Sequence, residues 1–184
     1  MSESGVRERL RAAAVELIVE RGWSAVSTRM LAERAGVAPG VVHYHFGSVG
    51  ALLREAALGV LRGLVDQLAG ALPHGADGTV RLLVSSLSAY DGTDPTSLLF
   101  TETYLAATRD AELRDELWRI VADLRTRLAE RLTGVPDAAA TAAVLAASVD
   151  GILLHRALGP GLDPPALTRV MRRLVAPRTG TEQA

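Results

Sequence analysis

Apolar residues recur at helical spacing along most of the chain. Between residues 6 and 21, Leu10, Ala14, Leu17 and Ile18 stand at positions i, i+4, i+7 and i+8, the pattern of an amphipathic helix. Similar patterns continue beyond this segment. They predict helices over 28–35, 39–46, a long segment carrying Leu52 to Leu68, 79–89, 96–107, 110–133, 137–158 and 164–175. The expected fold class is all-α, with about nine helices.

Residues that begin or end helices separate these segments. Gly22 and Gly36 follow apolar runs and are expected to end the first two helices. Ser27 and Ser48 are expected to cap the helices that follow them. Pro39 suits the first turn of a helix, where a missing N–H group costs nothing.

One segment, VVHYHF at residues 41–46, is ambiguous. Val42, Tyr44 and Phe46 alternate with the residues between them, which is also a strand pattern. No partner strand is evident elsewhere in the sequence, and an isolated strand cannot satisfy its backbone hydrogen bonds. We therefore predict a helix here.

Composition places the chain among soluble helical proteins. Hydrophobic residues make up 48% of the sequence, aromatic residues 4%, and cysteine is absent, which excludes disulfides. The charged N-terminus is unlike a signal peptide, and no apolar run reaches the ~18 residues of a membrane span. We expect a cytoplasmic protein without a membrane partner. The net charge is −1, and every cation is an arginine, because lysine does not occur.

The two short predicted helices follow the plan of a helix-turn-helix motif. Residues 28–35 form the first helix, 36–38 the turn, and 39–46 the second, with helix 6–21 bracing the pair. In such motifs the second helix enters the DNA major groove. This also explains why an aromatic-poor chain places two histidines, a tyrosine and a phenylalanine in residues 43–46.

At this point the sequence resembles the TetR family of transcription regulators. The resemblance implies a homodimer that binds a palindromic operator on double-stranded DNA and responds to a small-molecule effector. It also implies a DNA-binding domain over residues 1–50, an effector-binding and dimerisation domain over 51–177, and a tail over 178–184 that we expect to be disordered. The matching residues are Gly22, Trp23, Ser27, Thr28, Leu31, Ala32, Ala35, Gly36, Val37, Gly40, Tyr44, His45, Phe46, Leu52 and Leu53.

Candidate DNA contacts lie in and around the second helix. Arg29 has the best chemistry for reading bases, because a guanidinium can bind guanine O6 and N7 together. Thr28 and Tyr44 suit phosphate contacts, and Pro39 and Val41 offer apolar surface to a thymine methyl. The remaining candidates are His43 and His45.

The sequence departs from the family pattern near these residues. The family usually has Tyr at His43, Ser at Ala38 and Lys at Val49, so several usual phosphate donors are missing. Arg54 is a possible substitute. A metal site is not expected, because His43 and His45 lie about 200° apart around a helix.

Small residues form a ridge along the predicted helix 137–158. Spaced four apart, they let helices approach closely, and the last helix adds apolar residues at a/d-like spacing that include Leu167 and Met171. Together these helices can form half of a four-helix bundle with a second copy; the alternative is that the ridge is internal core. The expected interface residues are Ala143, Ala147, Gly151, His155, Val170 and Leu174.

The central helices carry candidates for an effector pocket. Aromatic side chains with a few polar groups are typical of small-molecule sites, although aromatics at helical spacing are more often core. Because charges are few, a fairly apolar effector, uncharged or weakly anionic, is expected. The candidate residues are Tyr90, Phe100, Thr103, Tyr104, Trp118 and Asp150.

Three functions compete at this stage. The favoured one is a ligand-responsive DNA-binding repressor. An enzyme is disfavoured, because the sequence has no nucleophile–base pair, glycine-rich phosphate loop or metal spacing, and no cofactor is expected. The third is a sensory or interaction module with weakened or lost DNA binding, which the missing Tyr and Lys keep open.

Overall fold

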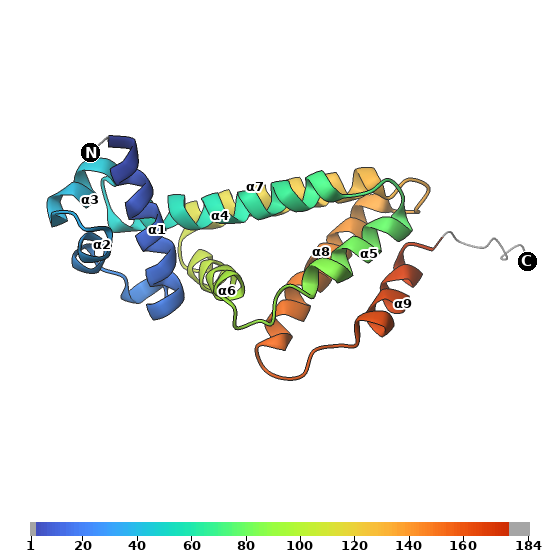
Figure 1. Ribbon diagram of the computed structural model, residues 1–184. Coiled ribbons are helices and arrows are strands. Elements are labelled where there is room, and N and C mark those ends of the chain that lie inside the picture. Colours follow the sequence, from blue (N-terminus) through green and yellow to red (C-terminus); the bar gives the residue numbers. More distant parts are fainter. Residues whose placement is uncertain (1–2, 177–184) are drawn as a thin grey trace, which may run out of the picture. The chain divides into compact units, whose positions relative to one another are not determined.

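The computed structural model describes residues 3–176, and in this range the chain is entirely helical (Figure 1). The predicted ambiguous segment 41–46 is helix, and the all-α fold class is confirmed. The predicted tail over 178–184 lies outside the described residues. The described helices are α1 (Glu3–Arg21), the short 3₁₀ helix η1 (Trp23–Ala25), α2 (Thr28–Ala35), α3 (Pro39–Phe46), α4 (Val49–Ala71), α5 (Ala76–Leu87), α6 (Pro95–Ala107), α7 (Ala111–Arg131), α8 (Ala138–Arg156) and α9 (Pro164–Leu174).

The predicted helix signals act as expected around the helix-turn-helix motif. The Ser27 hydroxyl accepts a hydrogen bond from the Met30 N–H at 3.4 Å, and the Ser48 hydroxyl accepts one from Ala51 N–H at 3.1 Å. Gly36 ends α2 in the left-handed conformation, at φ 64°, which favours glycine. Pro39 occupies the first turn of α3.

The chain divides into two compact units. The first contains residues up to Leu64 together with Asp94–Ile120, and the second contains Val65–Thr93 together with residues from Val121 onward. Helices α4 and α7 contribute residues to both units. The predicted division of function between residues 1–50 and 51–177 stays a prediction.

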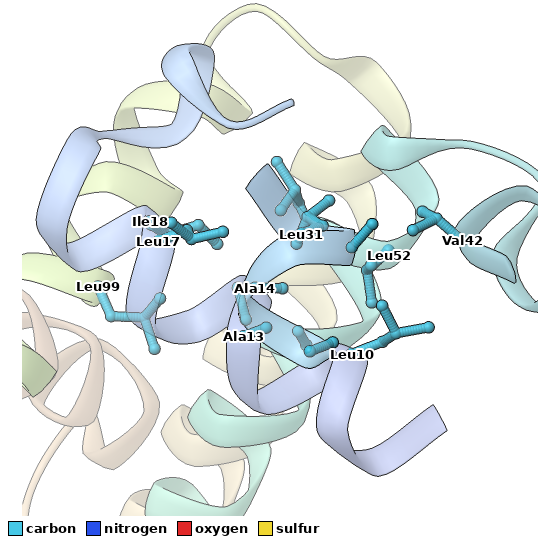
Figure 2. Close-up of a cluster of buried hydrophobic side chains, with 14 residues drawn as sticks. Leu10, Ala13, Ala14, Leu17, Ile18, Leu31, Val42, Leu52 and Leu99 are labelled. Atoms are coloured by element: carbon cyan, nitrogen blue, oxygen red, sulfur yellow. The ribbon is translucent and has the colours of Figure 1, made fainter. Parts of the chain in front are cut away.

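The core of the first unit joins the helix-turn-helix motif to its bracing helix. Leu10 and Ile18 of α1 are fully buried with Leu31 of α2, Val42 of α3 and Leu52 of α4 (Figure 2). Leu99 of α6 belongs to the same cluster. Burying aliphatic side chains of this size stabilises the fold by about 1.5–3 kcal/mol each. Helix α1 packs against α2, and α2 packs against α3.

The second unit has a separate aliphatic core. Leu83 and Leu87 of α5 pack with Leu128 of α7 and Leu145 of α8, all nearly inaccessible to solvent. Met171 of α9 closes this cluster. Helix α9 thus docks on its own chain through one face and leaves the other face exposed.

Candidate nucleic-acid interface

Helix α3 presents most of its surface to solvent. Val42 is its one fully buried residue, whereas Pro39, Gly40, His43 and Tyr44 are exposed. We call these four exposed residues the reading face. Tyr44 is 78% exposed, so its ring and hydroxyl are accessible to a partner outside the chain.

The other predicted contacts lie beside the reading face. Thr28 and Arg29 open α2, and Arg29 is exposed, whereas Thr28, Val41 and His45 are half-buried. The edge of the His45 ring meets Tyr44 at 5.0 Å and Phe46 at 6.5 Å between centroids. Phe46 packs against the core of the first unit.

Several arginines of the first unit are engaged in ion pairs. Arg7 and Arg11 both bind Glu55, and Arg34 of α2 binds two glutamates of α1, with its Nη1 2.8 Å from Glu16 Oε2. Arg29 differs, because its guanidinium has no hydrogen-bond or ion-pair partner among residues 3–176. Arg29 is therefore available for a ligand without breaking an existing contact.

The structure does not favour the expectation for Arg54, because this side chain already has acidic partners. Its side chain is 20% exposed and pairs with Asp110 at 3.4 Å and Glu112 at 2.9 Å, at the start of α7. A hydrogen bond from the Leu113 N–H, together with Arg54, holds the pKa of Asp110 below its ordinary value despite desolvation. Arg54 thus pairs α4 with α7 and does not replace the phosphate donor missing at Val49.

The His43 ring has one defined neighbour. Its Nδ1 lies 3.2 Å from the carbonyl oxygen of Gly47, just beyond the end of α3. A carbonyl oxygen only accepts, so this contact is a hydrogen bond when Nδ1 carries the hydrogen. The neutral ring then has only a lone pair on Nε2, and Nε2 becomes a donor when the ring is protonated.

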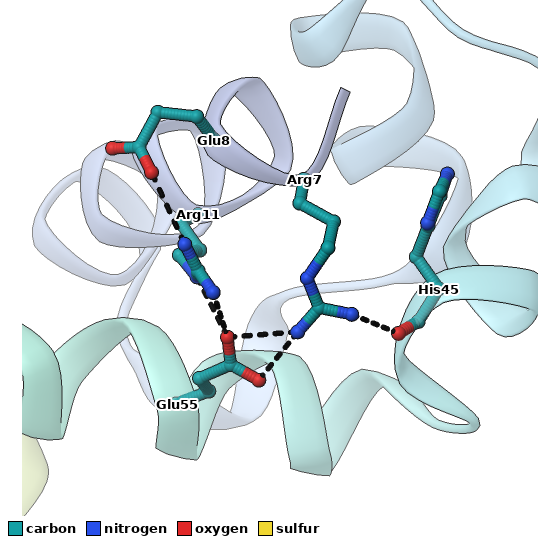
Figure 3. Close-up of polar contacts among 5 residues, drawn as sticks. All are labelled: Arg7, Glu8, Arg11, His45 and Glu55. Carbon is teal, nitrogen blue, oxygen red and sulfur yellow. Dashed lines mark hydrogen bonds and ion pairs between the residues drawn. The ribbon is translucent and has the colours of Figure 1, made fainter. Parts of the chain in front are cut away.

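A polar network at the end of α3 was missed by the sequence analysis (Figure 3). Arg7 of α1 donates from Nη1 to the carbonyl oxygen of His45 at 2.6 Å, and from Nη2 to the Glu55 carboxylate at 2.9 and 3.0 Å. Arg11 donates from Nε to Glu55 at 2.7 Å. The partners are 38 to 48 residues apart in sequence, so no local pattern announces them.

Two of the predicted effector residues meet on α6. The rings of Phe100 and Tyr104 lie 4.4 Å apart between centroids, at an angle of 40°. Thr103 is buried, and its hydroxyl donates to the Leu99 carbonyl oxygen of its own helix at 2.6 Å. Trp118 on α7 is exposed.

The two remaining effector candidates belong to the second unit. The carbonyl oxygen of Tyr90 accepts a hydrogen bond from Arg156 Nη1 at 2.7 Å, and Asp150 is half-buried on α8. Their participation in one site with Phe100 and Tyr104 stays a prediction.

Another face of the second unit is apolar and exposed. On α8, Ala147 and His155 are exposed, Ala143 and Gly151 are half-buried, and on α9 Val170 and Leu174 are exposed, so these predicted interface residues remain available to a partner. Only 17% of the most apolar window of α8 is buried. By length and composition alone this helix could cross a membrane, but the core helix of a soluble protein meets the same criteria.

Two residues of the expected a/d pattern are not part of that face. Leu167 and Met171 are buried, in the core that contains α5. The apolar residues of α9 are therefore divided between a buried face and an exposed face. Leu167 and Met171 cannot contact a second subunit without leaving the core.

A short exposed helix, seated on a bracing helix and preceded by a glycine-ended helix and tight turn, defines a helix-turn-helix DNA-binding regulator. The chain matches the family model "Bacterial regulatory proteins, tetR family" over residues 10–56, and the model "Tetracyclin repressor-like, C-terminal domain" over residues 74–177. It belongs to the TetR family. Members of this family are transcriptional regulators, bind DNA and small molecules, and act as dimers.

Individual relatives agree with this assignment. The chain is 30% identical over 158 residues to the HTH-type transcriptional regulator BetI of Rhizobium meliloti, covering 83% of this chain and 78% of BetI. It is 26% identical over 163 residues to the transcriptional repressor KstR2 of Rhodococcus jostii, covering 85% and 76%. The structure of the multidrug binding protein EbrR, complexed with malachite green, superposes with a TM-score of 0.74 at 27% identity and covers 92% of this chain and 98% of EbrR.

Proposed function

We propose that this protein is a homodimeric repressor that a small effector releases from a palindromic operator. The observation that carries the proposal is the reading face of α3, whose residues are exposed while Val42 alone is buried. A helix with this division of burial can enter the major groove without losing its packing on α1. Bacterial regulators that read DNA act in the cytoplasm, where we place this protein.

Within the groove, the predicted contacts divide by chemistry. Arg29, which has no hydrogen-bond or ion-pair partner in the described part of the chain, is the candidate for bidentate recognition of guanine. Tyr44 and Thr28 supply hydroxyl groups to phosphates, and His43 supplies an imidazole N–H group. Pro39 and Val41 offer only apolar surface. The imidazole of His45 is less accessible than that of His43.

The exposed face of α8 and α9 supports two-fold assembly. Ala147 and Gly151 are small enough to let a partner helix approach, and Val170 and Leu174 provide apolar area beside them. An isologous dimer carries two copies of α3, so its operator has two half-sites related by two-fold symmetry. This use of the apolar α8 surface requires no membrane.

The effector is proposed to be fairly apolar. The adjacent, mutually tilted rings of Phe100 and Tyr104 offer an aromatic surface, and the relative EbrR was solved with malachite green. Effector binding lowers operator affinity only if the effector prefers a conformation that the operator disfavours. No residue of the proposed site suggests an enzymatic reaction.

The test is selection of DNA by the purified full chain. Random-sequence duplexes are enriched over several rounds, and we expect an inverted repeat that binds about 10³-fold or more tightly than random duplexes. An aromatic compound collection is then screened for molecules that release this duplex. Absence of any enriched sequence would instead support a sensory module that has lost DNA binding.

A further inference from the structure

Few buried side chains attach α3 to the first unit. The helix has eight residues, and only Val42 is fully buried, with Val41 and Phe46 packed at the edge of the core. The last carbonyl groups of a helix have no partner within it and need one elsewhere. The Gly47 N–H donates a hydrogen bond to the carbonyl oxygen of His43 at 2.9 Å. The carbonyl oxygen of His45 accepts its hydrogen bond from Arg7.

Arg7 contacts α3 in two ways at once. Its Nη1 donates to the His45 carbonyl oxygen at 2.6 Å, and its guanidinium carbon lies 4.3 Å from the centroid of the Phe46 ring, over the ring. A cation near the C-terminal end of a helix also interacts favourably with the helix dipole. One side chain of α1 therefore holds both the backbone and an aromatic ring at the end of α3.

Glu55 of α4 fixes Arg7 in this position. Both carboxylate oxygens accept from Arg7 Nη2, and Oε1 also accepts from Arg11 Nε (Figure 3). Burial acts to raise the pKa of Glu55, but the hydrogen bonds from Arg11 and Arg7 outweigh it and lower the pKa below its ordinary value. Glu55 is thus ionised at neutral pH and holds Arg7 throughout the range in which DNA binding is measured.

We propose that Arg7 is a positioning residue that sets the angle of α3 for base reading, and that Glu55 orients Arg7 for this purpose. This inference rests on the proposed DNA-binding function. Helix α3 packs mainly against α2 and has one fully buried residue, Val42, so the angle of its C-terminal end depends on the contact with Arg7. A tilt of about 5° over its length of about 12 Å moves one end by about 1 Å, which is enough to break a base contact.

The competing explanation is that Arg7 binds a phosphate directly. A phosphate contact strengthens binding to every DNA sequence and adds about 0.9 to the slope of log affinity against log salt. A positioning residue instead strengthens binding to the operator alone and leaves the slope unchanged. The ratio of operator affinity to random-DNA affinity therefore separates the two roles, and it does not depend on the active fraction of a preparation.

The experiment uses the full-length protein with fluorescent duplexes. One duplex carries the sequence selected by the wild type, and the other is a scrambled duplex of the same composition. Arg11→Met is the matched control, because Arg11 lies on the same helix, binds the same Glu55 and carries the same charge. Among residues 3–176, its hydrogen bonds go to Glu8 and Glu55 and not to α3. Melting temperature is followed by circular dichroism for every variant.

We expect Arg7→Met to lower the operator-to-scrambled ratio about tenfold, with an unchanged salt slope. Glu55→Gln should lower the ratio in the same direction, and the double variant should lose no more than Arg7→Met alone, because both act through one contact. Arg11→Met should stay within about twofold of the wild type. If Arg7→Met does not fold, Glu55→Gln and Arg7→Lys provide the same comparison.

Three results would overturn the inference. The first is an unchanged ratio in Arg7→Met and Glu55→Gln, the second is an equal loss in Arg11→Met, and the third is equal weakening on both duplexes with a reduced salt slope, which would make Arg7 a phosphate contact. Failure of the proposed function looks different, because the wild type itself would then select no operator.

Discussion

Operator affinity should depend on pH through His43. The Nδ1 atom faces the Gly47 carbonyl oxygen at 3.2 Å, so the neutral ring that donates this bond has only a lone pair on Nε2 to offer a phosphate. Protonation adds a second N–H group and a positive charge. Binding to phosphate therefore takes up a proton, and affinity should rise as pH falls from about 8 to 6.

The magnitude follows from counting protons. A dimer has one such histidine in each of its two copies of α3, so the limiting slope is about two log units of affinity per pH unit. Incomplete proton uptake reduces this limit, and we expect an overall rise of about 10- to 100-fold.

The assay is fluorescence anisotropy on the selected operator at constant salt, with three variants. His43→Phe removes the proton and the donor, so it should bind weakly and without the pH dependence. His43→Tyr restores the residue of similar proteins, and it should bind well at all pH values, because a hydroxyl donates without titrating in this range. His45→Phe should keep the wild-type dependence. Full dependence in His43→Phe would refute the reasoning and leave DNA reading to other residues.

Four further outcomes are expected. Arg29→Ala should cost about 1–3 kcal/mol on the operator and little on random DNA; equal loss on both would make Arg29 a phosphate anchor. Val42→Ala removes two methyl groups from a fully buried site, so the free energy of unfolding in urea should fall by about 2–3 kcal/mol, and an unchanged midpoint contradicts this. Ala147→Glu should yield monomers in analytical ultracentrifugation, whereas an intact dimer would exclude the proposed interface. The slope of log affinity against log salt should have a magnitude of roughly 4–8, because two copies of α3 each make a few phosphate contacts; a flat response would favour loss of DNA binding.

The sequence predicted those parts of the fold that local chemistry determines. Ser27, Gly36 and Pro39 mark the ends of α2 and the start of α3 through groups only a few residues away, so their roles were readable. The 3₁₀ helix η1 was missed. Its first N–H group, that of Trp23, donates to Glu102 at 2.8 Å, a partner 79 residues distant in the chain.

The site was predictable in type and less so in detail. The exposure of His43 and Tyr44 followed from the helix-turn-helix pattern, because side chains of the second helix that contact DNA must stay accessible. The pairing of Arg54 with Asp110 could not be predicted from the sequence, because these residues are 56 positions apart. A charged side chain on an amphipathic helix is equally compatible with water, DNA or a distant carboxylate, and only the fold decides which.

The small number of buried contacts in α3 has a consequence for changing operator preference. A side chain added at Gly40 would meet no atom within 4 Å, and His43 and Tyr44 also point away from the core. An alanine in place of a helical glycine is favourable by roughly 0.5–1 kcal/mol. Residues 40, 43 and 44 can therefore be randomised together without weakening the core. A library of variants at these three positions is suitable for selecting regulators with new DNA targets.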